Sequence, residues 1–294
     1  MKQPTDVAQF SISTNPIKGP LKWVGMENIK SPIQGFTKDS IPAQISALVS
    51  LSKGDQKGIH MSRIYELVQS LSCKTLSKKK IFETLDEMVA TQKGSSDAAK
   101  LTVKAQPLLQ RPALLSEKMG YKSYPMQIHG TRKKNTNQLV VTLRVEYSST
   151  CPCSAALSRE AIAEEFMKRF QEGKVDCKDV EAFLTNESTW PAWPHSQRSQ
   201  AQGHFLLNDH QELPDFSKLV DQMERALGTP TQTAVKRIDE KEFARLNAQN
   251  LMFCEDAARR LKAAFQNSEF KDFKFWVRHF ESLHSHDVYA ESRK

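Results

Sequence analysis

Two cysteines flank a proline in Cys151-Pro152-Cys153, directly after a predicted strand that ends near Ser148. The end of a strand can hold a thiol rigidly at a cleft, where it could bind a metal, undergo redox chemistry or simply pack. Pro152 restricts the backbone, so joint ligation of one metal by both cysteines is awkward. A structural zinc site would also require a second Cys-x-x-Cys, which the sequence lacks. The motif therefore indicates a positioned thiol and leaves its chemistry open.

Histidines occur in two further polar runs. The run His195-Ser196-Gln197-Arg198-Ser199 lies just before a predicted strand, where it suits a metal site, an anion site or a solvated loop. The run Glu281-Ser282-Leu283-His284-Ser285-His286 has its two histidines two residues apart. In an extended chain both would point to one face and Glu281 to the other. This pair indicates a metal or phosphate site, or an ordinary edge strand.

A fourth segment, Asp55 to Arg63, links a strong predicted strand to the helix that follows it. Its glycines permit tight turns, the helix start offers free N–H groups, and Lys57, His60 and Arg63 add positive charge. Together these features can hold a phosphate, although a helix-capping turn with surface charges would have the same composition. The spacing of a Walker loop is absent.

Hydrophobic periodicity predicts the elements that must position these side chains. Apolar and polar residues alternate, as in strands, near 21–26, 41–51, 101–105, 124–128, 139–147, 204–207, 273–277 and 288–289. Helical spacing occurs at 61–71, 81–89, 216–227 and 252–265. Each half of the chain thus has the order β-β-α-α-β-β. This order predicts an α+β fold of antiparallel sheets with helices on one face.

The same order divides the chain into parts. Residues 1–18 contain two prolines and little periodicity, and we expect a loose tail there. The first predicted module covers 19–135 and the second covers 136–294. The second module carries an insertion at about 157–194, with one or two helices and a pair of tryptophans beside prolines at its end. These tryptophans suit a rigid lid or, more simply, a packed corner.

The chain has 294 residues, with 42 lysines and arginines against 34 aspartates and glutamates, a net charge of +8. An excess of this size suits an anionic partner, from a phosphorylated small molecule to RNA. No apolar run approaches the ~20 residues of a membrane helix, and the polar segment from Met1 to Pro20 does not indicate secretion. The five cysteines are odd in number and sparse, which favours reduced thiols. We expect a soluble, cytoplasmic protein without a membrane partner.

The four motifs occur in the same order as in the GTP cyclohydrolase type IB family, which the sequence resembles from about Gly19 to the C-terminus. They are Asp55-Gln56-Lys57-Gly58-Ile59-His60-Met61-Ser62-Arg63, Cys151-Pro152-Cys153-Ser154, His195-Ser196-Gln197-Arg198-Ser199 and Glu281-Ser282-Leu283-His284-Ser285-His286. Each is weak alone, but four in order are specific. The resemblance implies tandem tunnelling-fold modules in a homotetramer, with active sites between subunits. It also implies hydrolysis of GTP to formate and 7,8-dihydroneopterin triphosphate, the first step of tetrahydrofolate and pterin biosynthesis.

One divalent metal per active site is a further implication of the resemblance. Cys151 and His195 match two of the family's ligands. Glu240, in Arg237-Ile238-Asp239-Glu240-Lys241, aligns best with the third, with isoleucine in place of the usual proline. The inserted segment separates Cys151 from His195 more widely than in the short family form. A mixed set of S, N and O donors suits Zn²⁺, Fe²⁺ or Mn²⁺, and three protein ligands leave a position for the water that attacks guanine C8.

The resemblance also assigns substrate contacts. Glu281 matches the acid that anchors the purine, because a carboxylate can accept hydrogen bonds from guanine N1–H and the 2-amino group together. We expect His284 or His286 to transfer protons. The residues whose charge and position suit binding of the triphosphate are Lys57, His60, Arg63 and Arg198. We expect some of them to come from a neighbouring subunit.

Two other functions are open at this point. One is a related tunnelling-fold enzyme, such as the nitrile reductase of queuosine biosynthesis, which would need a nucleophilic cysteine and NADPH. The other is a non-enzymatic basic protein that binds nucleotides or RNA, whose binding to mixed RNA would fall steeply with salt. Our expectation is the GTP cyclohydrolase, with no nucleic-acid partner.

Overall fold

The computed structural model describes residues 19–53, 56, 58–134, 136–171 and 174–294, so the predicted tail at 1–18 and Lys57 lie outside the described residues. Its strands are β1 (Leu21–Ile33), β2 (Ile41–Leu51), β3 (Ala98–Ala105), β4 (Leu108–Pro112), β5 (Met119–Ser123), β6 (Met126–Lys133), β7 (Thr136–Thr150), β8 (Ser196–Leu206), β9 (Asp272–His279) and β10 (Val288–Arg293). Its helices are α1 (Met61–Gln69), α2 (Lys78–Ala90), α3 (Pro152–Arg169), α4 (Cys177–Thr185), α5 (Phe216–Leu227), α6 (Arg237–Gln249) and α7 (Cys254–Phe265), with a 3-10 turn, η2 (Glu187–Thr189).

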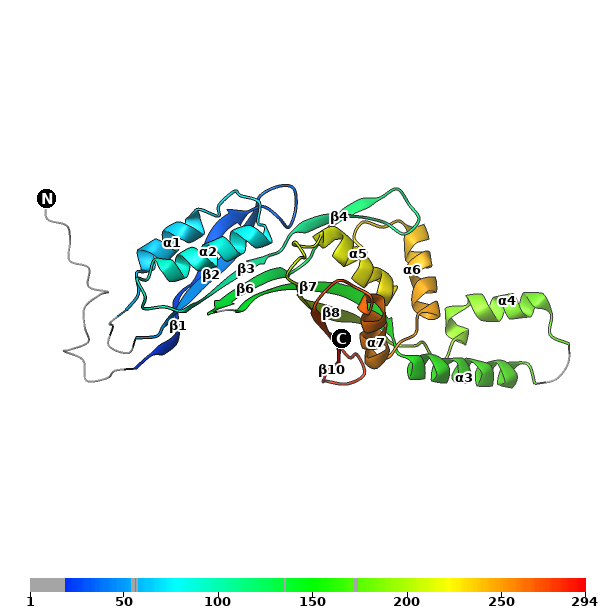
Figure 1. Ribbon diagram of the computed structural model, residues 1–294. Helices are drawn as coiled ribbons and strands as arrows, with labels where there is room; N and C mark the ends of the chain where they lie inside the picture. The colour runs from blue at the N-terminus through cyan, green and yellow to red at the C-terminus, as the bar shows by residue number, and fades with distance from the viewer. Residues whose placement is uncertain (1–18, 54–55, 57, 135, 172–173) are drawn as a thin grey trace.

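Eight of these strands form one long antiparallel sheet in the order β1-β2-β3-β6-β7-β8-β9-β10 (Figure 1). The first half of the chain contributes β1-β2-α1-α2-β3-β6, and the second contributes β7-β8-α5-α7-β9-β10. The predicted α+β fold, with antiparallel strands and the tunnelling-fold order, is therefore confirmed. The division into two modules at residue 135 stays a prediction, because the β6–β7 hairpin joins both halves in one sheet.

Alternation along the strands places one face of the sheet against the helices. Ile45 of β2 pairs with Val103 of β3, and Ile128 of β6 pairs with Val141 of β7. All four side chains are buried on the same face, so a single core runs through both halves. The helices complete this core with apolar stripes, which include Ile64, Leu85, Val220 and Leu261.

The ribbon β4–β5 and helix α6 were not predicted, because few of their side chains are buried. Asp239 is the one buried residue of α6, so no apolar stripe marks this helix in the sequence. Its carboxylate accepts hydrogen bonds from the N–H groups of Lys236 at 2.7 Å and Leu115 at 2.8 Å, which ties the ribbon's turn to the start of α6. The ribbon is also held to α5 by the buried ion pair between Lys122 and Glu224, at 2.8 Å.

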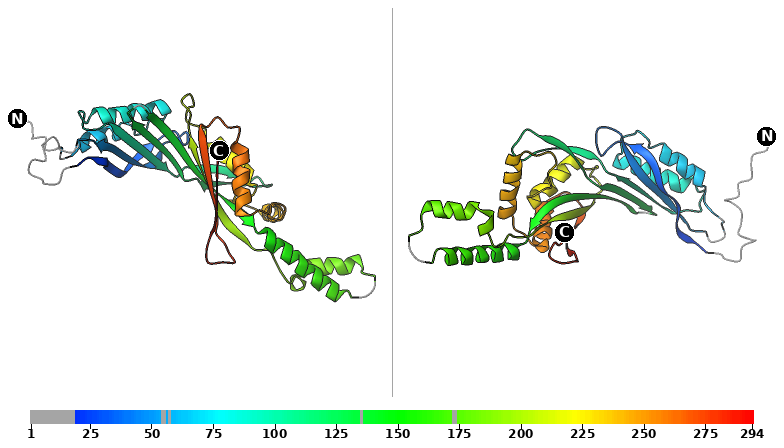
Figure 2. Two further views of the ribbon diagram at one scale, coloured as in Figure 1. Left: turned by 60° about the horizontal axis from the view of Figure 1, so that its bottom comes forward. Right: turned by 180° about the vertical axis from the view of Figure 1, so that it is seen from behind.

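The segment between β7 and β8 contains α3 and α4 and begins with α3 at Pro152. The two helices project from the end of the sheet, away from the rest of the molecule (Figure 2). All five cysteines of the chain lie within the described residues and are free thiols. Within the same residues, no helix combines the length and the apolar character needed to cross a membrane.

Candidate active site

Three strand ends bring the cysteine, histidine and acidic motifs together. Thr150 at the end of β7 pairs with Ser196 at the start of β8. Cys151 therefore stands opposite His195, whose carbonyl accepts a hydrogen bond from the Cys151 N–H at 3.3 Å. The neighbouring strand β9 ends two residues before Glu281. Because side chains alternate along paired strands, this register places the site residues at one end of the helix-covered face.

The ring of His195 is held through its Nδ1 atom. This nitrogen lies 3.2 Å from Gln197 Oε1, 3.1 Å from Ser282 Oγ and 3.4 Å from Glu281 Oε1. A histidine that binds a metal through one ring nitrogen usually has the other held by a carboxylate, a carbonyl or water. Across the residues the structure describes, His195 Nε2 has no protein partner. This nitrogen is therefore available to a metal.

Glu281 is largely buried, with 12% of its side chain exposed. Its Oε1 accepts hydrogen bonds from the backbone N–H groups of Ser282 at 2.9 Å and Leu283 at 3.3 Å. Burial acts to raise the pKa of Glu281, but these N–H groups and the nearby His195 outweigh it, so the pKa lies below its ordinary value. The carboxylate is therefore ionised at neutral pH and can accept further hydrogen bonds.

A buried hydrogen-bond network joins the same three strands next to the site. Tyr147 Oη lies 2.8 Å from His279 Nε2, and His279 Nδ1 lies 3.2 Å from Ser149 Oγ. Ser149 Oγ in turn lies 2.8 Å from Ser199 Oγ. Burial lowers the pKa of His279 to about 4, so its ring is neutral in the folded protein at neutral pH. The network fixes the relative positions of β7, β8 and β9, whose ends carry the site.

This network was missed in the sequence, although a signal was present. Ser149, Ser199 and His279 occupy positions on strands where the alternation calls for apolar side chains. A buried polar group is costly unless it has a hydrogen-bond partner, so several such positions on neighbouring strands indicate a network. The pairing of the strands had to be known before these residues could be connected.

His284 and His286 lie in the loop between β9 and β10, and not in the extended segment that their spacing suggested. The chain bends from residue 282 to 286, where the Glu281 carboxylate accepts hydrogen bonds from the N–H groups of Ser282 and Leu283. The two imidazole rings nevertheless stack, with centroids 5.0 Å apart and planes 11° from parallel. Both side chains are exposed and stand near the site, directly after Glu281.

The predicted third metal ligand, Glu240, is not placed beside the other two. It lies in the first turn of α6, where its side chain is 52% exposed and pairs with Arg237 at 2.9 Å. Within the part of the chain that the structure describes, no group of three or more His, Cys, Asp or Glu residues is arranged to hold a metal ion. Cys153, which is exposed on α3, is not part of such a group either.

The predicted phosphate-binding residues are separated within one chain. His60 and Arg63 lie at the start of α1, at the end of the molecule away from α3 and the candidate site (Figure 1). The His60 N–H donates to Gln92 Oε1, and Arg63 donates to the carbonyl of Thr91, each at 2.8 Å. Arg198 lies in β8 and lines a separate pocket of about 420 Å³ beside the β4–β5 ribbon.

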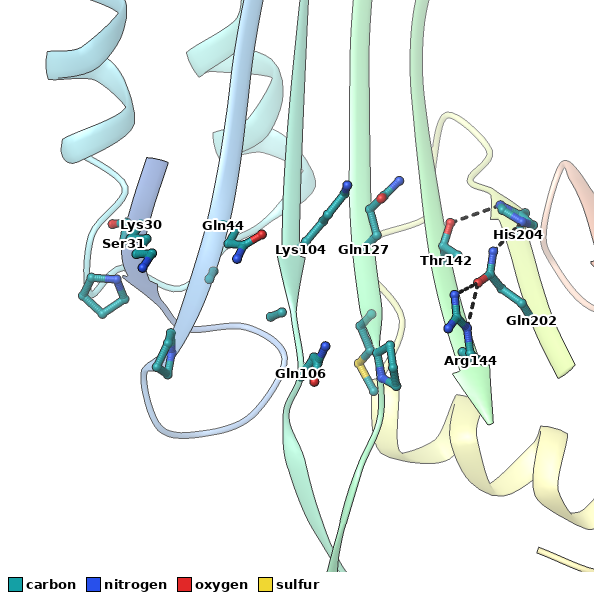
Figure 3. A pocket seen from close by; sticks show the side chains of 16 residues that line it. Lys30, Ser31, Gln44, Lys104, Gln106, Gln127, Thr142, Arg144, Gln202 and His204 are labelled. Atoms are coloured by element: carbon teal, nitrogen blue, oxygen red, sulfur yellow. Dashed lines mark hydrogen bonds between the residues drawn. The ribbon is translucent and has the colours of Figure 1, made fainter. Parts of the chain in front are cut away.

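A larger cavity, of about 940 Å³, lies on the sheet face that the helices leave open (Figure 3). Arg144 donates to Gln202 Oε1 there, at 3.1 and 3.2 Å from its two nitrogens. None of the 16 residues lining the cavity is acidic, and its basic residues are Lys30, Lys104, Arg144 and His204. Cys151 and His195 belong to the opposite face, so this cavity is not part of the candidate site.

The two β-β-α-α-β-β halves and the thiol and imidazole at the strand ends define a tunnelling-fold protein. A family model described as type I GTP cyclohydrolase folE2 matches residues 6–290. The chain is 44% identical over 277 residues to the GTP cyclohydrolase FolE2 of Pseudoalteromonas atlantica, covering 92% of this chain and 90% of that protein. It is 44% identical over 275 residues to the GTP cyclohydrolase FolE2 of Pseudomonas putida, covering 93% and 91%. The chain belongs to the type I GTP cyclohydrolase folE2 family.

Among solved structures, the uricase of Arthrobacter globiformis matches with a TM-score of 0.48 and 8% identity, over 94% of this chain and 93% of that one.

Proposed function

We propose that this protein hydrolyses GTP to formate and 7,8-dihydroneopterin triphosphate at the strand ends that carry Cys151, His195 and Glu281. The protein is a GTP cyclohydrolase of folate biosynthesis, as its family and its relatives indicate. The placement of the reaction rests on one observation. Cys151 stands opposite His195, and the Nδ1 atom of His195 lies beside the Glu281 carboxylate. This arrangement leaves one thiol and one imidazole nitrogen for a common ligand.

These donors fit the metal on which GTP cyclohydrolases in general depend. Cys151 supplies sulfur, and His195 supplies a nitrogen whose ring is oriented in the manner of metal-binding histidines. Glu240 is our proposed third ligand, and it would have to exchange its contact with Arg237 for the metal. Zn²⁺, Mn²⁺ and Fe²⁺ all suit such a donor set. The bound metal would make hydroxide available near neutral pH for attack on guanine C8.

Glu281 has two tasks in this proposal. Its Oε1 holds His195 and two backbone N–H groups, whereas Oε2 has no protein partner among the described residues. The ionised carboxylate retains lone pairs for guanine N1–H and the 2-amino group, which would distinguish guanine from adenine. His284 and His286 follow on the exposed loop, where they can exchange protons with the opening ring or with the rearranging ribose.

The triphosphate contacts require a second copy of the chain. His60 and Arg63 stand at the start of α1, at the far end of the molecule from α3 and the Cys151 that precedes it, so a site that contains them together with Cys151 would be formed between subunits. Because the site needs more than one copy of the chain, we propose a homotetramer. In it, Arg198 is the phosphate contact that the second half of the chain supplies. The free state of all five cysteines agrees with a cytoplasmic location.

A GTP assay on metal-stripped protein tests the proposal. Mn²⁺, Zn²⁺ or Fe²⁺ is added back without oxygen, and the readouts are formate and the fluorescence of neopterin after oxidation and phosphatase treatment. We expect at least one metal to restore turnover. If folded, tetrameric protein forms no product with any of the metals, the proposed reaction is contradicted. The substrate would then be another purine or a pterin.

A further inference from the structure

The cavity on the open face of the sheet is lined by a continuous row of polar and basic side chains (Figure 3). Strand pairing places six of its lining residues side by side, one on each of β1, β2, β3, β6, β7 and β8. In strand order they are Lys30, Gln44, Lys104, Gln127, Thr142 and His204. Because neighbouring strands lie about 4.8 Å apart, the backbones at Lys30 and Lys104 are separated by roughly 10 Å. The row therefore spreads positive charge across the cavity.

Arg144, a further cation of the cavity, is held in place by a chain of hydrogen bonds. Its Nε and Nη2 atoms donate to Gln202 Oε1, and the amide nitrogen of Gln202 lies 2.9 Å from His204 Nε2. An amide nitrogen can only donate, so His204 Nε2 accepts and the ring is neutral. Burial and the charge of Lys274 lower the pKa of His204, in agreement with a neutral ring. His204 Nδ1 therefore carries the proton and donates to Thr142 Oγ1 at 3.2 Å.

This chain of bonds leaves donors that no group among the described residues uses. The Nη1 edge of the Arg144 guanidinium has no acceptor there, and neither of the lysines Lys30 and Lys104 forms an ion pair or a hydrogen bond. The Thr142 hydroxyl accepts from His204 and keeps its own proton to donate. A guanidinium edge carries two parallel N–H groups, which match two oxygens of one phosphate.

The positive charge of the cavity is not balanced by the carboxylates of the same face. Among the described residues that line the cavity, none is acidic. Glu146 follows Arg144 by two residues on β7, but it accepts from Gln200 at 3.0 Å and lines the separate pocket beside the ribbon. On β9, Glu291 pairs with Lys274 at 2.7 Å. The cavity is therefore a place of positive potential that attracts anions.

Size and composition limit which anion fits. A volume of about 940 Å³ is that of a site for a small molecule. Beside the polar row, Pro32 pairs with Pro42, and these two prolines line the cavity together with Pro125. They give one rim an apolar surface without N–H groups. Cations spread over several strands suit a ligand whose negative charges are also spread, as they are along linked phosphates.

We propose that this cavity binds a small molecule that carries a chain of two or three phosphates. One phosphate accepts hydrogen bonds from the free edge of Arg144, and the chain extends along the row toward Lys104. The site is separate from the candidate active site, because Cys151 and His195 belong to the opposite face of the sheet. It gives the enzyme a second place at which a phosphorylated compound acts.

Calorimetric titration of the full-length, metal-loaded protein with tripolyphosphate tests the proposal. The variants are Arg144→Gln and Lys104→Gln, and the control is Lys100→Gln. Lys100 lies on the same face of β3, outside the cavity and over the Trp23 ring, and its replacement removes the same charge. We expect each cavity variant to weaken binding at least about ten-fold and the control to bind as the wild type does. Contact of the probe with the metal contributes equally to all four proteins.

The same variants distinguish this site from the active site. We expect Arg144→Gln to keep the kcat and KM for GTP of the wild type. A KM for GTP that rises together with the loss of tripolyphosphate binding would make the cavity part of the active site and overturn the proposal. Absence of saturable binding to the wild type, or a control as damaging as Arg144→Gln, would also overturn it. The titration needs no GTP turnover, so its result is independent of the proposed reaction.

Titration with ATP identifies the source of the phosphate chain. Adenine lacks the donor pair of guanine, so ATP avoids the guanine contact proposed at Glu281. Binding of ATP that is tighter than that of tripolyphosphate would support a nucleoside triphosphate, with its ring system on the proline rim. Equal affinities would support recognition of the phosphate chain alone. In both cases Arg144→Gln should weaken the binding.

Discussion

The Nδ1 atom of His195 lies 3.4 Å from Oε1 of Glu281, although helices α5, α6 and α7 separate the two residues in the sequence. This contact fixes which ring nitrogen of His195 is left for a ligand, and it does so with an ionised carboxylate. It also makes the guanine-binding candidate and a metal-binding candidate neighbours. Metal content and GTP affinity should therefore both be measured for any variant at either residue.

Replacement of the proposed sulfur ligand should remove metal and activity together. We expect Cys151→Ala to lower GTP turnover by more than about 100-fold, since loss of an outer contact to a metal ligand alone costs about 10–100-fold. Metal content by elemental analysis and formate release are the measurements. Cys153→Ala is the matched control, because this thiol is exposed two residues away and should be dispensable. A Cys151→Ala variant that keeps its metal and its activity would remove this residue from the metal site.

Glu281→Gln should separate substrate binding from metal binding. Gln197 and Ser282 still hold the Nδ1 atom of His195 in this variant, so the metal should be retained. The NH₂ group of the substituted side chain, however, opposes the donors of guanine, and the loss of two charge-assisted bonds at about 1.5 kcal/mol each predicts roughly 100-fold weaker GTP binding. Titration calorimetry with GTP and elemental analysis on the same sample are the tests. Unchanged GTP affinity would reject guanine anchoring by Glu281.

The buried His279 should make stability depend on pH. Its pKa is lowered from 6.5 to about 4 by burial, so the unfolded state binds a proton in this interval and the folded state does not. Stability is therefore full above pH 6.5 and falls as the pH decreases toward 4, by about 2 kcal/mol at pH 5. Urea unfolding of the wild type at pH 7.5 and pH 5 measures the loss.

His279→Gln provides the comparison for that experiment. The amide is neutral at both pH values and can reach the hydroxyls of Tyr147 or Ser149, so its pH dependence should be smaller than that of the wild type. His129 and His204 also have a pKa lowered by burial, and they contribute equally to both proteins. Identical pH dependence in the two proteins would show that His279 is not the responsible group.

The ion pair of Lys122 with Glu224 should be important for the attachment of the β4–β5 ribbon. Lys122 Nζ donates to the carboxylate at 2.8 Å and to the carbonyls of Glu146 and Thr231, and both charged side chains are nearly buried. We expect Lys122→Met to reduce the free energy of unfolding by about 3 kcal/mol, because it leaves the Glu224 charge buried with the Tyr124 hydroxyl as its remaining hydrogen-bond donor. Lys79→Met, which removes an exposed partner of Glu83, should cost less than about 1 kcal/mol. Chemical unfolding curves of both variants measure these two changes in the free energy of unfolding.

Elements with one buried face were the ones that the sequence predicted well. The alternation from Ile41 to Leu51 coincides with β2, and the helical stripe from Phe216 to Leu227 coincides with α5. Helix α6 was missed because only Asp239 is buried, and the loop at His284 was mistaken for an extended segment because spacing carries no information on bends. Hydrophobic patterns report burial, and exposed elements leave little pattern to read.

The sequence by itself determined the order of the elements, the α+β class and the motifs from which the family could be recognised. Only the tertiary structure decided that Cys151 stands opposite His195, that Glu281 reaches the His195 ring, and that Glu240 pairs with Arg237. The physical reason is strand register. A shift of two residues leaves the alternation of a strand unchanged, so the pattern identifies the buried face but not the partner of each residue. Packing across the whole sheet selects the register, and the register assembles the site.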